Sequence, residues 1–132
     1  MKYLLDTNIC IYFFRGKYDI KERINIAGIE NCAISEITLA ELVYGAEHSS
    51  NPKKNHGLIA DLTEQIATIS IFDSILEYGQ QKSRLRKQGA LISDFDLLIG
   101  STAIANGLTM VTQNTREFER LQGIELENWV NG

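Results

Sequence analysis

The sequence predicts an α/β domain with three layers, in which helices cover both faces of a central, mainly parallel sheet. Short β-rich runs alternate with helical stretches along the chain, as they do in successive βα units. Three of the four central strand candidates are short apolar runs, as expected for strands buried on both faces. The chain has 132 residues, a single proline and no Gly/Ser-rich linker. We therefore expect one domain over residues 1–132.

Four segments have the composition of central strands, and a fifth suits the edge of the sheet. Most of them combine β-branched residues with other apolar residues, which favours strands. The predicted strands are Lys2–Asp6, Cys32–Ser35, Ala67–Phe72, Thr109–Thr112 and, at the edge, Ile124–Leu126.

Four helices are predicted between these strands. Their ranges are Ile9–Phe14, Thr38–Glu47, Ser74–Gln88 and Phe95–Asn106. One face of the second helix carries apolar residues at helical spacing: Leu39, Leu42, Val43 and Ala46. Gly89 and Gly107 follow the last two helices, and glycine is a common residue just after a helix end. The polar run at residues 48–52 predicts a loop.

Composition excludes several classes of protein. Lys and Arg total 13 and Asp and Glu total 17, which gives a net charge of −4, far from the basic balance of a dedicated nucleic-acid binder. No stretch approaches the roughly 20 apolar residues that span a bilayer, and Asp6 interrupts the first apolar run with no cleavage site after it. Cys10 and Cys32 are too few for a disulfide framework or a thiolate metal site. We expect a cytoplasmic protein without membrane insertion.

Polar side chains stand where predicted strands end and helices begin. They are Asp6 after the first strand, Glu41 in the first turn of the helix after the second, Asp94 and Asp96 at the start of Phe95–Asn106, and Asn114 after the fourth strand. Ligands of open parallel sheets bind outside the carboxyl ends of the strands. We therefore expect these groups to converge on one rim, where a divalent cation would relieve their repulsion. Carboxylates without histidine or thiolate ligands favour Mg²⁺ or Mn²⁺.

Helix capping is the alternative reading of the same acids. Thr38 and Glu41 fit a capping box, in which Glu41 would accept from the Thr38 amide. Ser93 and the acids that follow it fit an N-cap whose carboxylates complement the helix dipole. Asp6 could cap the helix that begins near Asn8, but an isolated buried carboxylate at a strand end is costly.

The segment at residues 82–87 carries four cations and no acid on one helix. These are Lys82, Arg84, Arg86 and Lys87. They could face a polyphosphate backbone such as that of RNA. The alternative is a solvated helix face whose cations complement the C-terminal end of the helix dipole.

Three pieces of the chain resemble the PIN-domain ribonucleases, and among them the VapC toxins of bacterial toxin–antitoxin pairs. They are LLDTNICIYFFRG at the start, AISEITLAELVYG around Glu41, and DFDLLIGSTAIANGLTMVTQNTREFERLQGIELENW near the end. The three pieces run along the full chain in the family's order.

The resemblance implies a PIN-like fold that binds Mg²⁺ or Mn²⁺ and hydrolyses RNA phosphodiesters. Asp6, Glu41 and Asp96 match the family's three acids, and Asn114 matches a fourth position held by Asp or Asn. Asp94 stands where close relatives are often not acidic, so any role that it has would be to support the metal ligands and not to bind the metal directly.

The resemblance also implies partners. VapC toxins form homodimers and are held inactive by a small VapB-type antitoxin whose C-terminal segment covers the active-site groove. Relatives from enteric bacteria cut initiator tRNA in its anticodon stem–loop, which makes tRNA the expected substrate and inhibition of translation the expected effect.

Three other functions compete with a metal-dependent nuclease. A phosphatase of the haloacid dehalogenase type needs Asp-x-Asp after the first strand, whereas this chain has Asp6-Thr7-Asn8. A metal-independent ribonuclease needs a His or Lys acid–base pair, and His48 and His56 lie in or beside a polar loop. A non-cleaving PIN-fold module that only holds RNA or an antitoxin stays open.

Overall fold

A computed structural model describes residues 1–130, which form a five-stranded sheet in the order β3-β2-β1-β4-β5. The strands are β1 (Tyr3–Leu5), β2 (Cys32–Ser35), β3 (Ala67–Ile69), β4 (Thr109–Val111) and β5 (Glu125–Glu127). All four strand pairings are parallel, and Leu4 of β1 is in register with Ala33 of β2 and Met110 of β4. The parallel sheet and the edge strand near residue 125 confirm the predicted arrangement.

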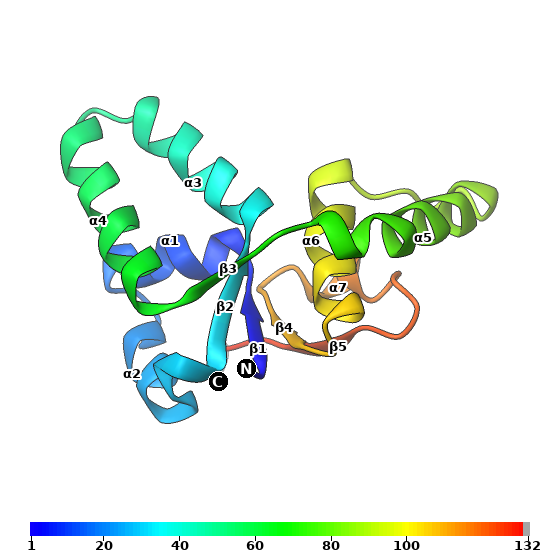
Figure 1. Cartoon of the computed structure of the whole chain (residues 1–132), viewed down its shortest axis with the longest axis horizontal. Helices are drawn as coiled ribbons and strands as arrows, with labels where there is room; N and C mark the ends of the chain where they lie inside the picture. The colour runs from blue at the N-terminus through cyan, green and yellow to red at the C-terminus, as the bar shows by residue number, and fades with distance from the viewer. Residues whose placement is uncertain (131–132) are drawn as a thin grey trace.

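Helices cover both faces of the sheet, which confirms the three layers. They are α1 (Thr7–Arg15), α2 (Ile20–Ala27), α3 (Glu36–Glu47), α4 (Pro52–Gln65), α5 (Ile75–Lys87), α6 (Asp94–Ala105) and α7 (Thr115–Phe118). Figure 1 shows α1 to α4 on one side of the sheet and α5 to α7 on the other. Within residues 1–130, no helix has the length and apolar composition needed to cross a membrane.

The strands supply residues alternately to two separate cores, because successive side chains of a strand point to opposite faces. Leu5 packs with the first core, which includes Ile9, Leu42 and Leu62 from α1, α3 and α4. Its neighbour Leu4 packs with the second core, which lies under α5 to α7. Both β1 residues are at most 1% exposed, so this strand is buried on both faces as its apolar run predicted.

The third strand is shorter than the predicted range 67–72. β3 ends at Ile69, which pairs with Ser35, the last residue of β2. Beyond that pair, the backbone bonds to a side chain in place of a neighbouring strand: the Ile71 N–H donates to Glu36 Oε1 over 2.8 Å. The strand ends where its partner strand gives way to α3.

Two helices in the first layer, α2 and α4, lie in segments for which we predicted no helix. The start of α4 does follow a local rule, since Asn51 is its N-cap and Pro52 its first helical residue. The Asn51 Oδ1 accepts from the Lys54 N–H at 3.2 Å. The predicted loop is therefore confirmed up to Asn51, and Pro52 belongs to the helix.

Gln81 joins α5 to the turn that precedes β5. Its side chain is 5% exposed, donates to the Gln122 carbonyl over 2.8 Å and accepts from the Gln122 N–H over 3.1 Å. Replacing Gln81 with Ala removes both hydrogen bonds to the Gln122 backbone, each worth roughly 0.5–1.5 kcal/mol, so the free energy of unfolding should fall by about 1–3 kcal/mol. Urea denaturation of Gln81→Ala measures this, with Gln80→Ala, an exposed neighbour on the same helix, as the matched control. Equal losses in the two variants would contradict the role.

Candidate active site

Asp6 lies between the end of β1 and the start of α1, and it is 4% exposed. Its Oδ1 accepts from the Thr7 N–H at 2.8 Å, and its Oδ2 accepts from Thr112 Oγ1 at 2.8 Å. Asp6 is therefore the N-cap of α1, as the capping reading predicted. Burial raises its pKa to about 6, and the negative charges of Asp96 and Glu41 act in the same direction against the two hydrogen bonds. Capping uses one oxygen and leaves the carboxylate beside two other acids.

Glu41 lies in the second turn of α3 and approaches the start of α1. Thr7 Oγ1 donates to Glu41 Oε1 over 2.7 Å. The capping-box reading was wrong, because α3 begins at Glu36 and Ser35 caps it by accepting from the Ile37 N–H at 3.1 Å. Thr38 is thus inside the helix and buried.

Asp96 reaches the same place from the second layer, at the start of α6. Ser93 Oγ accepts from the Asp96 N–H at 3.2 Å, which confirms Ser93 as the N-cap. Burial raises the pKa of Asp96, and the charges of Glu117 and Glu41 raise it further. The pKa of Asp96 is therefore affected by acids on two other helices, α3 and α7.

Glu117 is a fourth carboxylate that sequence reasoning missed. It lies in α7, and its negative charge is one of the causes that raise the pKa of Asp96. The available signal was an acid three residues after Asn114, in the segment that follows β4.

Asn114 is exposed, and its backbone connects it to the acids. Its N–H donates to Thr112 Oγ1 over 2.9 Å, and the same hydroxyl donates to Asp6. Thr112, which is fully buried, therefore links Asn114 to Asp6.

Replacing Thr112 with Val should lower the free energy of unfolding by about 1–3 kcal/mol, because the Asp6 carboxylate and the Asn114 N–H each lose a partner. Thermal and urea denaturation of Thr112→Val measure the loss. Thr109→Val is the matched control. Thr109 lies in β4, the strand that Thr112 directly follows, and its hydroxyl forms only one long hydrogen bond, of 3.4 Å, to Glu125. A control as destabilised as Thr112→Val would contradict the assignment.

Asp94 lies two residues before Asp96 and pairs away from the acids. Lys82 Nζ is 2.8 Å from Asp94 Oδ1, and the Tyr78 hydroxyl donates to the same oxygen over 2.9 Å. These bonds lower the pKa of Asp94 and raise that of Lys82. The cluster connects α5 to α6 beside the Ser93 cap.

The other predicted cations lie on the same helix. Arg84 donates to the Arg120 carbonyl over 2.6 Å and to Gln81 over 2.8 Å, so it holds the turn after α7. Arg86 and Lys87 are exposed, and neither forms an ion pair with another residue of the described chain.

The four acids have no basic partner. The ion pairs among residues 1–130 are His56–Glu47 and Lys82–Asp94, and neither includes Asp6, Glu41, Asp96 or Glu117. Within the same residues, no three His, Cys, Asp or Glu side chains are close enough together to hold a metal ion as a ready-made cluster. The site therefore gathers oxygen ligands from both layers, but it does not form a closed cage.

Comparison with known proteins is consistent over the whole chain. The PIN domain family model matches residues 3–124. The "tRNA(fMet)-specific endonuclease VapC" of Shigella flexneri is 39% identical over 131 residues, 98% of each chain. The "Ribonuclease VapC" of Haemophilus influenzae is 39% identical over 132 residues, 98% of this chain and 99% of that one.

Solved structures agree with these relatives. The DNA-bound VapBC of Salmonella typhimurium matches with a TM-score of 0.91 and 35% identity, covering 98% of each chain. VapBC2 of Rickettsia felis, bound to a promoter DNA fragment, matches with a TM-score of 0.90 and 34% identity, covering 98% of this chain and 99% of that one. The chain therefore belongs to the PIN-domain family and, within it, to the VapC ribonucleases.

Proposed function

We propose that this chain is the toxin of a VapBC-type toxin–antitoxin pair and a metal-dependent endoribonuclease that inhibits translation by cutting tRNA. The observation that carries the nuclease is the meeting of Asp6, Glu41, Asp96 and Glu117, from four separate elements, at the carboxyl end of the sheet. Burial raises the pKa values of Asp6 and Asp96, and the repulsion among these carboxylates, which have no basic partner, raises them further. Such a group is organised to receive positive charge.

The donor set fits Mg²⁺ or Mn²⁺. All candidate ligands are carboxylate oxygens, which these cations prefer, and both cysteines are buried away from solvent. Because three acids do not form a ready-made cluster, an ion here would keep several water ligands, as Mg²⁺ commonly does in proteins. Asp6, Glu41 and Asp96 would hold it, with Glu117 as a fourth oxygen donor.

The residues of the site have distinct roles in this proposal. An ion held by these acids would supply a water of lowered pKa and positive charge to offset the charge that develops on the reacting phosphate. Thr112 and the Thr7 N–H hold both oxygens of Asp6 in place, and the Thr7 hydroxyl orients Glu41. Asn114 would orient a water or a phosphate oxygen. In-line attack by water on phosphorus would form the new P–O bond and break the bond to the ribose 3′-oxygen, which would leave as a hydroxyl with a proton from solvent, so the downstream fragment would begin with a 5′-phosphate.

Relatives support the substrate and the partners. The Shigella flexneri protein is named for tRNA(fMet), and the matched Salmonella and Rickettsia structures are VapBC complexes. We propose initiator tRNA, cut in its anticodon stem–loop in the cytoplasm, as the substrate, and a VapB-type antitoxin as the inhibitor. A homodimer that forms a hetero-oligomer with this antitoxin completes the proposal.

The exposed cations of α5 are proposed to contact the RNA backbone. Arg86 and Lys87 are available for this, whereas Lys82 and Arg84 already bond to Asp94 and to the Arg120 carbonyl. Phosphate contacts by lysine and arginine supply affinity without sequence preference.

Cleavage of total cellular RNA by the purified, antitoxin-free protein tests the proposed function. We expect discrete fragments with Mg²⁺ or Mn²⁺ that disappear with EDTA and with Asp96→Asn, and sequencing of their 5′ ends would identify the target. A folded protein that binds RNA but cuts none with either cation would instead be a non-cleaving binding module.

A further inference from the structure

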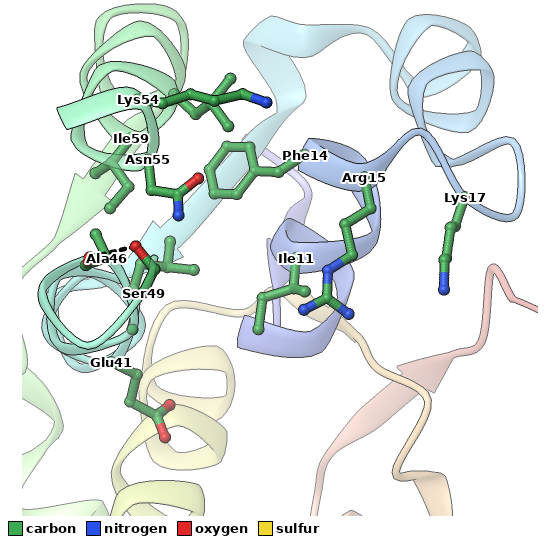
Figure 2. Close-up of a pocket in the computed structure, with 13 residues that line it drawn as sticks. Ile11, Phe14, Arg15, Lys17, Glu41, Ala46, Ser49, Lys54, Asn55 and Ile59 are labelled. Carbon is green, nitrogen blue, oxygen red and sulfur yellow. Dashed lines mark hydrogen bonds between the residues drawn. The ribbon is translucent and has the colours of Figure 1, made fainter. Parts of the chain in front are cut away.

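A cavity of about 580 Å³ opens beside the candidate active site, between α1, α3 and α4. Glu41 belongs to both, since it lines the cavity and accepts from Thr7 at the acidic cluster. Figure 2 shows the Glu41 side chain at one end of the cavity, with residues of α1 and α4 facing each other above it. A molecule held at Glu41 can therefore extend into this cavity.

Three cations are among the residues that line the cavity, with Arg15 and Lys17 on one side and Lys54 on the other (Figure 2). Arg15 ends α1, Lys17 follows the left-handed Gly16, and Lys54 lies in the first turn of α4. Gly16 has a φ of 64°, and the Lys17 N–H beyond it donates to the Tyr12 carbonyl over 2.9 Å, which fixes the backbone at this rim.

These three cations are exposed, and none forms an ion pair with another residue between 1 and 130. In a protein with a net charge of −4, three unpaired cations around one opening form a local positive surface. Because this surface adjoins the acidic cluster, it offers a path by which a polyanion can approach the acids.

The walls between the cations are suited to a flat ring with a polar edge. The Phe14 ring is half-buried and, in Figure 2, points from α1 towards Asn55 of α4. Asn55 is also half-buried, and its side-chain amide has no hydrogen-bond partner among the described residues, so it can both donate and accept. Ile11 and Ile59 complete an apolar wall.

We propose that this cavity binds one unstacked nucleotide of the RNA next to the cleaved bond. The base lies against Phe14 with its edge at Asn55, and the neighbouring phosphates contact Arg15, Lys17 and Lys54. Proteins that read single-stranded RNA combine these elements: an aromatic face, polar groups for the base edge and cations for the backbone. The volume lies in the range of small-molecule sites. This inference rests on the proposed function, because it takes RNA as the substrate.

A protein segment is the competing occupant. Apolar side chains of such a segment could fill the walls, but they would leave the three rim cations without partners. RNA uses the cations, the amide and the ring together, so charge complementarity favours RNA.

Binding is measured in an Asp96→Asn background, where the RNA stays intact, with a fluorescein-labelled RNA of the initiator tRNA anticodon stem–loop. We expect Arg15→Ala/Lys17→Ala/Lys54→Ala to weaken binding by roughly 10-fold or more and to flatten its salt dependence. Phe14→Leu, which keeps an apolar side chain, should weaken binding by roughly 10-fold with little change in the salt dependence. The matched control is Lys53→Ala, an exposed lysine beside Lys54 that does not line the cavity.

In the cleaving protein, the same substitutions should raise KM and leave kcat within about two-fold, because they act on binding. Affinity equal to that of the Lys53→Ala control in both the triple variant and Phe14→Leu would overturn the inference and assign the cavity to a protein segment. Failure of the unsubstituted protein to cut RNA would count against the proposed nuclease alone, since the binding comparison does not depend on cleavage.

Discussion

Replacing Asp6 with Asn should abolish RNA cleavage and, at neutral pH, should stabilise the metal-free protein. The loss of activity should be roughly 10³-fold or more, the scale seen when one member of a catalytic set is removed. Asn preserves the shape of the side chain, so its oxygen can still accept from the Thr7 N–H and its amide can donate to Thr112. What disappears is a buried negative charge that the proposed cation needs.

The gain in stability follows from the sign of the pKa change. The pKa of Asp6 is about 6 in the folded protein, against an ordinary value of 3.8, so the folded state binds the proton more tightly than the unfolded state. The contribution of Asp6 to the free energy of unfolding is therefore fully present below about pH 4, and it is lost as the pH rises through 6. The difference between the folded and ordinary pKa values sets an upper limit of roughly 3 kcal/mol on this loss of stability at pH 7.

Urea denaturation at pH 5 and pH 7.5 in EDTA measures the effect. Asp6→Asn should unfold at higher urea than the unsubstituted protein at pH 7.5, with a smaller difference at pH 5. Asp61→Asn, on the exposed face of α4, is the matched control and should leave stability nearly unchanged. A stability of Asp6→Asn below that of the unsubstituted protein at pH 7.5 would contradict the assigned burial cost.

Adding Mn²⁺ or Mg²⁺ should raise the melting temperature of the unsubstituted protein, and EDTA should reverse the rise and stop cleavage. A concentration of about 100 times Kd contributes roughly 2.7 kcal/mol to the free energy of unfolding, which corresponds to a rise of about 10 °C for a domain of this size. The rise in melting temperature is expected because the cation would relieve the repulsion among the four acids. It should therefore depend on these acids.

Differential scanning fluorimetry of matched variants distinguishes site binding from general ion effects. Asp96→Asn should lose most of the rise, whereas Asp94→Asn should keep it, because Asp94 already pairs with Lys82. An equal rise in both variants would show that the cation acts outside the acidic cluster. A loss confined to Asp94→Asn would move the metal ligand to that residue.

The central layers of the fold could be predicted from local sequence, because apolar runs buried on both faces have few alternatives. The Lys2–Asp6 run contains β1, and the range predicted for β2 is the observed one. The end of β3 could not be predicted in this way, because it depends on Glu36, more than thirty residues earlier in the chain. Helices α2 and α4 are largely polar at the surface, and their apolar faces become evident only against the first core.

The candidate site was predictable to the extent that it follows strand ends. Asp6 is a helix N-cap and Asp96 lies in the first turn of a helix, where spacing alone draws attention to them. Thr112 joins the site through a hydrogen bond to Asp6, and Glu117 through the effect of its charge on Asp96. Spacing along the sequence does not reveal such interactions across the fold. The partner of Glu41 was misassigned for the same reason, since Thr7 is distant in sequence and Thr38 is near.

The two cores divide the acidic cluster between them. Glu41 belongs to a helix packed in the first core, and Asp96 and Glu117 belong to helices packed over the second. Asp6 directly follows β1 of the sheet that separates the two cores. The distances between the carboxylates therefore depend on how the elements packed in the first core are placed relative to those packed in the second. A cavity-forming change such as Leu62→Ala, far along α4, would act on the chemistry through the first core, which also contains residues of α1 and α3, and so through Asp6 and Glu41. We therefore expect activity to be sensitive to packing defects that never touch the site.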